Sequence, residues 1–472
     1  MNSLVILIVT LALILAPWVW TFFVDGKVSA RDYRASPSAF SSAMVSISTI
    51  GTIVGGAMFL AVGQIGFEAG VVGFILGLVY LVAFSLFGIF SSRVAVVMEQ
   101  EGVDTVYGLI EKKGTLRMSR LYTISNCMLY TALVGSQVVV AKTFYTFLIS
   151  KGVHELIVGG ILLVAFLVVL SYSWVGGLKK DIRTDAIQMI VVTTATGIIV
   201  WLMIARMPVS VALTSLPSDH FSGVGYGVVY TIALVVFIGP MVFVRPDIWQ
   251  RAVALKNKRR IFPAFFATGV VAMFAFGVFT FLGMWARANF PTSVPASATL
   301  EAIWAVTSGG TGLIAAIIIG GLFAAILSTA DTLINNAAVH FEGAMRAHRA
   351  LEVTGEGDDI GILRIGSLGA IFFGISLSFL VTDVVDLISA SFSLLLVFLP
   401  VFIALFRKST FFEPPAFYSA VFGIVSWIFA LFVSNEPKEA FAYAVIASWL
   451  VYGLLFFLMH RAKDIKGVDL NK

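Results

Sequence analysis

The segment FAAILSTADTLIN, at residues 323–335, introduces polar side chains into an otherwise apolar stretch of the chain. On a helix, some of these residues are spaced i, i+3, i+4 and i+7 and share one face: Ser328, Asp331, Thr332 and Asn335. Thr329 lies at the edge of that face. Hard cations prefer hydroxyl and carboxylate oxygens, whereas transition metals prefer His or Cys. The stripe therefore predicts a site or path for a monovalent cation, and hydrogen bonding between packed helices is the alternative.

A second carboxylate opens another apolar stretch, YSWVGGLKKDIRTDAIQMIVV, at residues 172–192. Asp185 and Gln188 are spaced i, i+3 there and share a helix face. Because Asp185 follows a basic cluster, it could either join the cation path or form a surface ion pair with Arg183 or Lys180. The sequence leaves both alternatives open.

The composition of the whole chain excludes a soluble protein. Of its 472 residues, 59% are hydrophobic and 12% are charged, and the mean hydropathy is +0.99. A soluble domain carries about 25% charged residues. Repeated apolar blocks of about 20 residues instead predict an all-α polytopic membrane protein. The net charge of +5 does not suggest nucleic-acid binding, and the single Cys127 excludes an intramolecular disulfide.

Thirteen candidate membrane spans follow from the apolar blocks. They lie near residues 4–23, 40–66, 69–92, 121–149, 155–175, 184–205, 223–250, 262–286, 310–340, 361–381, 384–406, 416–434 and 439–460. With the amino terminus outside, the predicted outside loops hold few basic residues: Lys151, Arg206, Arg287 and Lys438. Cytoplasmic loops carry the excess of Lys and Arg in membrane proteins. We therefore expect a multi-pass protein of the cell (inner) membrane, with its carboxyl terminus in the cytoplasm.

Two of the predicted spans are interrupted by helix-breaking residues. STIGTIVGGAM contains Gly51, Gly55 and Gly56, and FIGPMVFVRPD contains Gly239, Pro240 and Pro246. Unwound backbone at membrane depth is tolerated where it lines a cavity or is buried in protein. The breaks are five spans apart, which predicts an inverted repeat with a binding site at the midplane. Close helix packing by glycine is the alternative for either span alone.

At these residues the chain resembles the sodium/solute symporter family, which has the LeuT-type five-plus-five inverted repeat. FAAILSTADTLIN resembles the eighth core helix of that family, GGLKKDIRTDAIQ the start of the fifth, and STIGTIVGGAMFLAVGQIGFEAG the broken first. The resemblance implies an extra amino-terminal span in residues 1–39, a first repeat in 40–206, an inverted second repeat in 207–407, and two peripheral spans with a tail in 408–472. It also implies a sodium-coupled symporter that imports a small organic solute by alternating access.

The resemblance also implies residues for the cations. The main sodium site would use the carbonyls of Gly51, Val54 and Ala325 and the hydroxyls of Ser328 and Thr329. Some family members hold a further sodium ion, and the matching groups are Asp185, Ser328, Asp331 and Thr332. Many members carry Ser at the position of Asp331, so this chain has an extra carboxylate there.

The solute cavity is expected beside the broken spans, lined by the first, third, sixth and tenth core helices. Its candidate residues are Met58, Phe59, Gln137, Lys142, Phe237, Met241, Ser391 and Ser393. Met58 stands where sugar transporters of the family carry an amide. Lys142 could meet a substrate carboxylate or extend toward the membrane interface. This favours a carboxylate or an amino acid as the solute.

Other functions remain open at this stage. Asp185 and Asp331 could relay protons, which would make the chain a proton-coupled transporter of the same fold. A membrane sensor with a transporter-like domain is a further alternative. No nucleophile–base pair or metal set indicates an enzyme. The expected partners are the solute, sodium and the lipid bilayer, with no obligate protein partner evident. Arg245 and Asp247 predict a gate or an ion pair at the inner end of their span.

Overall fold

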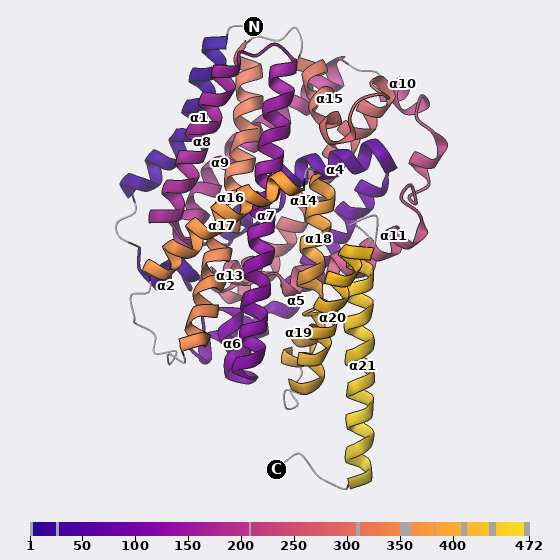
Figure 1. Cartoon of the computed structure of the whole chain (residues 1–472). Coiled ribbons are helices and arrows are strands. Elements are labelled where there is room, and N and C mark those ends of the chain that lie inside the picture. The colour runs from indigo at the N-terminus through magenta and orange to yellow at the C-terminus, as the bar shows by residue number, and fades with distance from the viewer. Residues whose placement is uncertain are drawn as a thin grey trace.

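The computed structural model describes residues 3–24, 28–206, 209–307, 312–349, 360–381, 383–406, 413–433 and 440–466. Within these ranges the regular structure is helical, apart from an isolated bridge between Phe40 and Leu255. The helices form one bundle, and α21 extends from it near the carboxyl terminus (Figure 1). The predicted all-α architecture is therefore confirmed.

The principal helices follow one another along the chain with short connections. They are α1 (Ser3–Val24), α2 (Ala30–Arg34), α3 (Ser42–Ile53), α4 (Gly56–Ala69), α5 (Val72–Gln100), α6 (Val106–Lys113), α7 (Leu116–Ser150), α8 (Glu155–Val175), α9 (Leu178–Arg206), α10 (Val209–Thr214), α11 (Val228–Ala233), α12 (Gly239–Val244), α13 (Pro246–Ala254), α14 (Ile261–Asn289), α15 (Ala298–Thr307), α16 (Gly312–Arg349), α17 (Ile360–Leu380), α18 (Val384–Leu396), α19 (Leu399–Phe406), α20 (Glu413–Val433) and α21 (Ala440–Lys466).

The apolar helices are long enough to make the chain a multi-pass membrane protein. In the described ranges, seven helices are long and apolar enough to cross a bilayer, and two bent pairs bring this to nine. Four shorter apolar helices, in α1, α8, α20 and α21, coincide with further predicted spans. The number of thirteen crossings and the two five-helix repeats stay predictions.

The first predicted break lies between α3 and α4, whose axes are bent by 56°. Glycine is required there because the break packs directly on α16. A Cβ atom at Gly55 would lie 1.5 Å from Oγ1 of Thr329, and one at Gly56 would lie 2.3 Å from Cγ1 of Ile326. The glycines of this segment therefore bring its backbone against the polar face of α16.

The second break lies at Arg245, where the chain bends by 48° between α12 and α13. Pro246 begins α13, and Arg245 before it has extended backbone, as residues before proline usually do. Gly239 and Pro240 instead begin α12 after a π-helical turn at Leu234–Ile238. Proline is tolerated at a helix start because the first N–H groups have no intrahelical partner. Pro246 therefore lies at the bend, whereas Gly239 and Pro240 lie at the start of α12.

The helix that carries the polar stripe lies in the middle of the bundle. α16 packs against α7, α9, α1 and α17, and its most apolar stretch is largely buried (Figure 1). α9 lies along one side of it, and the break between α3 and α4 lies against another. α9 and α16, the two helices that carry carboxylates within predicted spans, therefore lie in contact.

Candidate cation sites and solute cavity

Thr329 joins the polar face of α16 to the broken helix. Its hydroxyl lies 3.3 Å from the carbonyl oxygen of Gly51 and 3.0 Å from that of Ala325. Val54 caps the carboxyl end of α3, so its carbonyl belongs to the last turn before the break. Four groups predicted for the main sodium site are therefore on two elements in contact. Carbonyl and hydroxyl oxygens of this kind are ligands for a hard cation.

Ser328 faces the neighbouring helix α9. Its hydroxyl donates to one carboxylate oxygen of Asp185, and the hydroxyl of Ser48 on α3 donates to the other. Asp185 is completely buried, and its ion-pair partner is Arg251, with 3.3 Å between Nη2 and Oδ2. A surface ion pair of Asp185 with the basic cluster is therefore not the observed arrangement. Asp185 belongs to the interior, as the cation-path alternative requires.

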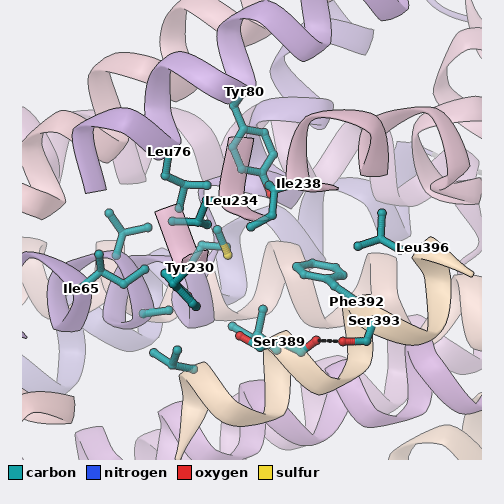
Figure 2. Close-up of a pocket in the computed structure, with 15 residues that line it drawn as sticks. Ile65, Leu76, Tyr80, Tyr230, Leu234, Ile238, Ser389, Phe392, Ser393 and Leu396 are labelled. Carbon is teal, nitrogen blue, oxygen red and sulfur yellow. Dashed lines mark hydrogen bonds between the residues drawn. The ribbon is translucent and has the colours of Figure 1, made fainter. Parts of the chain in front are cut away.

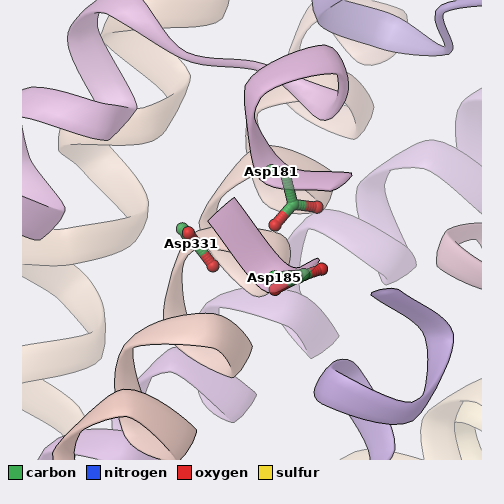
Figure 3. Close-up of side chains that lie close together, drawn as sticks. All are labelled: Asp181, Asp185 and Asp331. Atoms are coloured by element: carbon green, nitrogen blue, oxygen red, sulfur yellow. The ribbon is translucent and has the colours of Figure 1, made fainter. Parts of the chain in front are cut away.

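Three buried carboxylates meet between α9 and α16. Asp181, Asp185 and Asp331 each offer an oxygen within 4.8 Å of the others (Figure 3). The hydroxyl of Thr332 bonds to both oxygens of Asp181 at 2.9 Å. Asp181 was not among the predicted site residues, although it precedes Asp185 by four residues and so shares its helix face. This spacing was the available signal.

Arg251 on α13 lies inside this acidic cluster. Its side chain is fully buried and bonds to Asp181 at 3.2 Å, to Thr332 at 2.9 Å and to Ser48 at 3.0 Å. It therefore links α13 to α3, α9 and α16. Arg251 directly follows the predicted span 223–250, and its position in the sequence gives no reason to connect it with residues 181–185.

The charges of the cluster do not cancel. Arg251 forms ion pairs with Asp181 and Asp185, and Lys180 lines a small cleft together with Asp181 and Asp331. With all groups ionised, one negative charge is in excess. Buried charges are stable when they are paired or bind a cation. The excess therefore matches one monovalent cation, or one proton.

The same cleft contains polar atoms without protein partners. In the part of the chain that the structure describes, Oδ2 of Asp331 and both amide atoms of Asn335 are buried and make no hydrogen bond. Both residues line the cleft together with Tyr33, Gly176 and Gly177. Buried polar atoms in natural proteins nearly always have a partner. These atoms are available to an ion or to water.

A partly open cavity with a free volume of about 60 Å³ lies beside the broken helices. It lies between α4, α5, α18 and the segment that joins α11 to α12 (Figure 2). Of the predicted substrate residues, Met58 and Ser393 line it. The expected third core helix, α7, contributes no described residue to the lining, whereas α5 contributes Leu76 and Tyr80.

The other predicted substrate residues lie elsewhere. Phe59 packs on Phe279, with 4.8 Å between ring centroids, and Met241 is fully buried. Ser391 bonds to the carbonyl of Leu387, and Gln137 is buried in α7. The side chain of Phe237 lies outside the described residues.

Lys142 faces α17 and not the cavity. Its Nζ donates to the carbonyl of Ser378 at 2.9 Å and lies 4.6 Å from the ring centroid of Phe379. Neither Lys142 nor these two residues line the cavity, which removes the main reason for expecting a carboxylate solute.

Comparison with known proteins identifies the fold. No protein-family model matches the chain, and no curated protein matches it in sequence. Among solved structures, it is similar to a Na⁺-coupled sialic acid symporter in a substrate-bound outward-open state. The TM-score is 0.73 at 14% identity, over 96% of this chain and 97% of the other. It is also similar to Mhp1, a nucleobase-cation-symport-1 family transporter, with a TM-score of 0.53 at 15% identity, over 91% and 94% of the two chains.

The class of protein follows from these likenesses and from the bundle itself: the chain is a multi-pass membrane protein with a transporter fold. More specifically, the fold is the LeuT-type fold, as the resemblance in the sequence implied. At these identities the likeness establishes the fold, so the ions and the solute are argued from the site itself.

Proposed function

We propose that the chain is a sodium-coupled symporter that moves a small organic solute across the cell membrane by alternating access. The observation that carries this proposal is the contact between Thr329 and Gly51, where a broken helix meets the polar face of α16. The proposed main sodium ligands are Gly51, Val54, Ala325, Ser328 and Thr329. The sialic acid symporter of the same fold is described as Na⁺-coupled, which supports the proposal.

The acidic cluster is the proposed second cation site. Asp185, Asp331 and Thr332 were expected there, and Asp181 joins them. Because one negative charge is in excess, a sodium ion would neutralise the cluster. Since the cluster bonds α9 and α16 to α13 and α3, the charge held there affects how tightly these helices pack.

A sodium ion between α3 and α16 would couple the membrane potential to helix packing. One charge crossing a potential of 100 mV supplies about 2.3 kcal/mol, or about a fiftyfold accumulation. With the amino terminus outside, the inner end faces a cytoplasm that is poor in sodium. Loss of the ion there would loosen the contact between the broken helix and α16 and so favour release of the solute.

The sodium response of the purified protein tests the main site. We expect sodium to raise the melting temperature relative to potassium at the same ionic strength. Thr329→Val keeps the side-chain shape and removes a ligand, so it should raise the sodium concentration for half-maximal stabilisation about tenfold, or about 1.4 kcal/mol. Thr194→Val is the matched control, because Thr194 is exposed and bonds to its own helix at Ile190. Equal sodium responses in both variants would contradict the site.

Proton coupling is the second candidate, favoured by the three carboxylates within 4.8 Å of one another. Reconstituted vesicles separate the two drivers once a solute is known. A proton gradient that sustains full uptake in sodium-free buffer would exclude sodium coupling. Uptake that needs sodium and persists when the proton gradient is collapsed would exclude the proton alternative.

A further inference from the structure

The wall of the solute cavity has the chemistry of a site for an apolar or aromatic body. Its described lining residues are uncharged, and three of them are aromatic: Tyr80, Tyr230 and Phe392 (Figure 2). The hydroxyl of Ser393 donates to the carbonyl of Ser389 at 2.7 Å, so its proton is already used.

Arg245, the cationic side chain next to this cavity, is neutralised by an ion pair with Asp247. Arg245 lies 5.7 Å from the ring centroid of Phe392, but it forms a two-bond ion pair with Asp247 at 3.0 and 2.6 Å. A solute carboxylate entering the cavity would therefore find neither a free guanidinium nor a row of N–H donors. Burying a carboxylate without such partners is strongly unfavourable.

Acidic groups lie one helix turn beyond the lining residues. Glu68 follows the lining residue Ile65 by three positions on α4, and Asp383 directly precedes α18. The side-chain amide of Gln64 donates to both carboxylates at 3.2 Å, so the two acids lie close together. Tyr226 also donates to Glu68.

Tyr230 connects this acidic group to the cavity. Its ring lines the cavity and lies 5.0 Å from that of Tyr226 in an edge-to-face arrangement. The pair of carboxylates, Glu68 and Asp383, together with Gln64, is hereafter called the acidic mouth. The acidic mouth is at the end of α4 and α18 that the sequence predicts to face outside.

The acidic mouth has more acceptors than donors. Oε1 of Gln64 has no hydrogen-bond partner in the described part of the chain, and Gln64 is 6% exposed. No described Lys or Arg forms a salt bridge with Glu68 or Asp383. Arg287 instead stacks on Phe67, at 5.2 Å from its ring centroid. A buried acceptor and two carboxylates without a cation are the complement of an ammonium group.

We propose that the solute is a small organic cation, an amine or quaternary ammonium compound with an apolar body. This inference rests on the proposed transport function and names its substrate class. The acidic mouth attracts the cation, and the aromatic faces of the cavity hold it, because a cation over an aromatic ring gains about 0.5–2 kcal/mol. A cationic solute takes the place of the carboxylate or amino acid expected from Lys142.

Matched probes test the charge of the solute. Phenethylamine, its trimethylammonium analogue, phenethyl alcohol and hydrocinnamate share a phenyl ring and a similar length. In sodium buffer we expect the two cationic probes to raise the melting temperature of the full-length protein and hydrocinnamate to leave it unchanged. The proposal would be overturned if hydrocinnamate stabilised the protein, or if neither cationic probe did.

Charge-removing variants test the acidic mouth. Glu68→Gln and Asp383→Asn keep the shape and an acceptor oxygen, and Asn also serves as a helix cap. Each should weaken binding of the cationic probes about tenfold, whereas Glu301→Gln should not, because Glu301 already pairs with Lys151 at 2.7 Å. Unchanged binding in the first two variants would overturn the assignment.

The sodium response without any probe separates this inference from the proposed function. If sodium stabilises the protein but the cationic probes do not, the substrate class is wrong and the proposed symporter stands. If sodium itself has no effect relative to potassium, the proposed function fails. The same measurement on Glu68→Gln and Asp383→Asn verifies that both variants are folded.

Discussion

Arg251 offers the sharpest test of the buried charge arrangement. Arg251→Gln removes the cation that bonds to Asp181 and Asp185 and leaves the cluster with two excess negative charges in place of one. Removing one partner of a buried ion pair costs about 3–5 kcal/mol, because the other charge is left unpaired. We therefore expect a large loss of stability in sodium-free buffer.

The same variant should bind sodium more tightly, although it is less stable without sodium. Arg251 bonds to Asp181 at 3.2 Å and to Asp185 at 3.3 Å, so a sodium ion on the same carboxylates would lie roughly 5 Å from its guanidinium. At an effective dielectric constant of 20, two cations at that distance repel by about 3 kcal/mol. Removing Arg251 relieves this repulsion and should lower the half-maximal sodium concentration about a hundredfold.

Thermal unfolding at graded sodium concentrations measures both effects. Arg287→Gln is the matched control, since the guanidinium of Arg287 stacks on Phe67 and donates to the carbonyl of Pro291 at 3.1 Å. The control should unfold as the wild type does and show the same sodium response. If Arg251→Gln is as stable as the wild type, or if its sodium response is unchanged, the charge argument for the second site is refuted.

Two further substitutions test the carboxylate of Asp331 and the close packing at Gly55. Asp331→Asn removes the excess charge and should weaken sodium stabilisation about tenfold. Asp219→Asn should not, because Asp219 is exposed on the short 3₁₀ helix Ser218–Phe221; equal responses would contradict a role for the carboxylate of Asp331. Gly55→Ala places a methyl group 1.5 Å from Thr329 Oγ1, so thermal unfolding should show about 1–3 kcal/mol of destabilisation and loss of the sodium response. Gly197→Ala, with open space around it, should be neutral or stabilising, and a similar loss there would show that the effect at Gly55 is not specific.

The 3.6-residue period of an α-helix was enough to predict the part of the cation region that lies on α16. Ser328, Asp331 and Thr332 share a face on any α-helix, so the stripe on α16 could be identified without knowing what opposed it. The position of Asp181 follows from the same rule applied to α9. Arg251 could not be found in this way, because only the bend at Arg245 brings α13 back into contact with α3 and α9.

The solute cavity was harder to predict for a related reason. Which face of a buried, uniformly apolar helix points toward a cavity depends on its rotation, and one residue changes that rotation by 100°. Met58 and Ser393 lie on the cavity side, whereas Lys142 points toward α17. A charged residue inside a span indicates a function, but its sequence position does not identify its partner.

The broken helix gives the proposed sites a physical connection. α3 ends at Ile53, beside the oxygens proposed for sodium, and α4 begins at Gly56. α4 carries Met58 and Ile65 along the cavity and Glu68 beyond them. A ligand shifts a conformational equilibrium only by its difference in affinity for the two states. If the α3–α4 pair moves against α16, sodium and solute both gain or lose contacts on the same element. Each should therefore strengthen binding of the other, and the two coupling factors must be equal because the linkage is reciprocal.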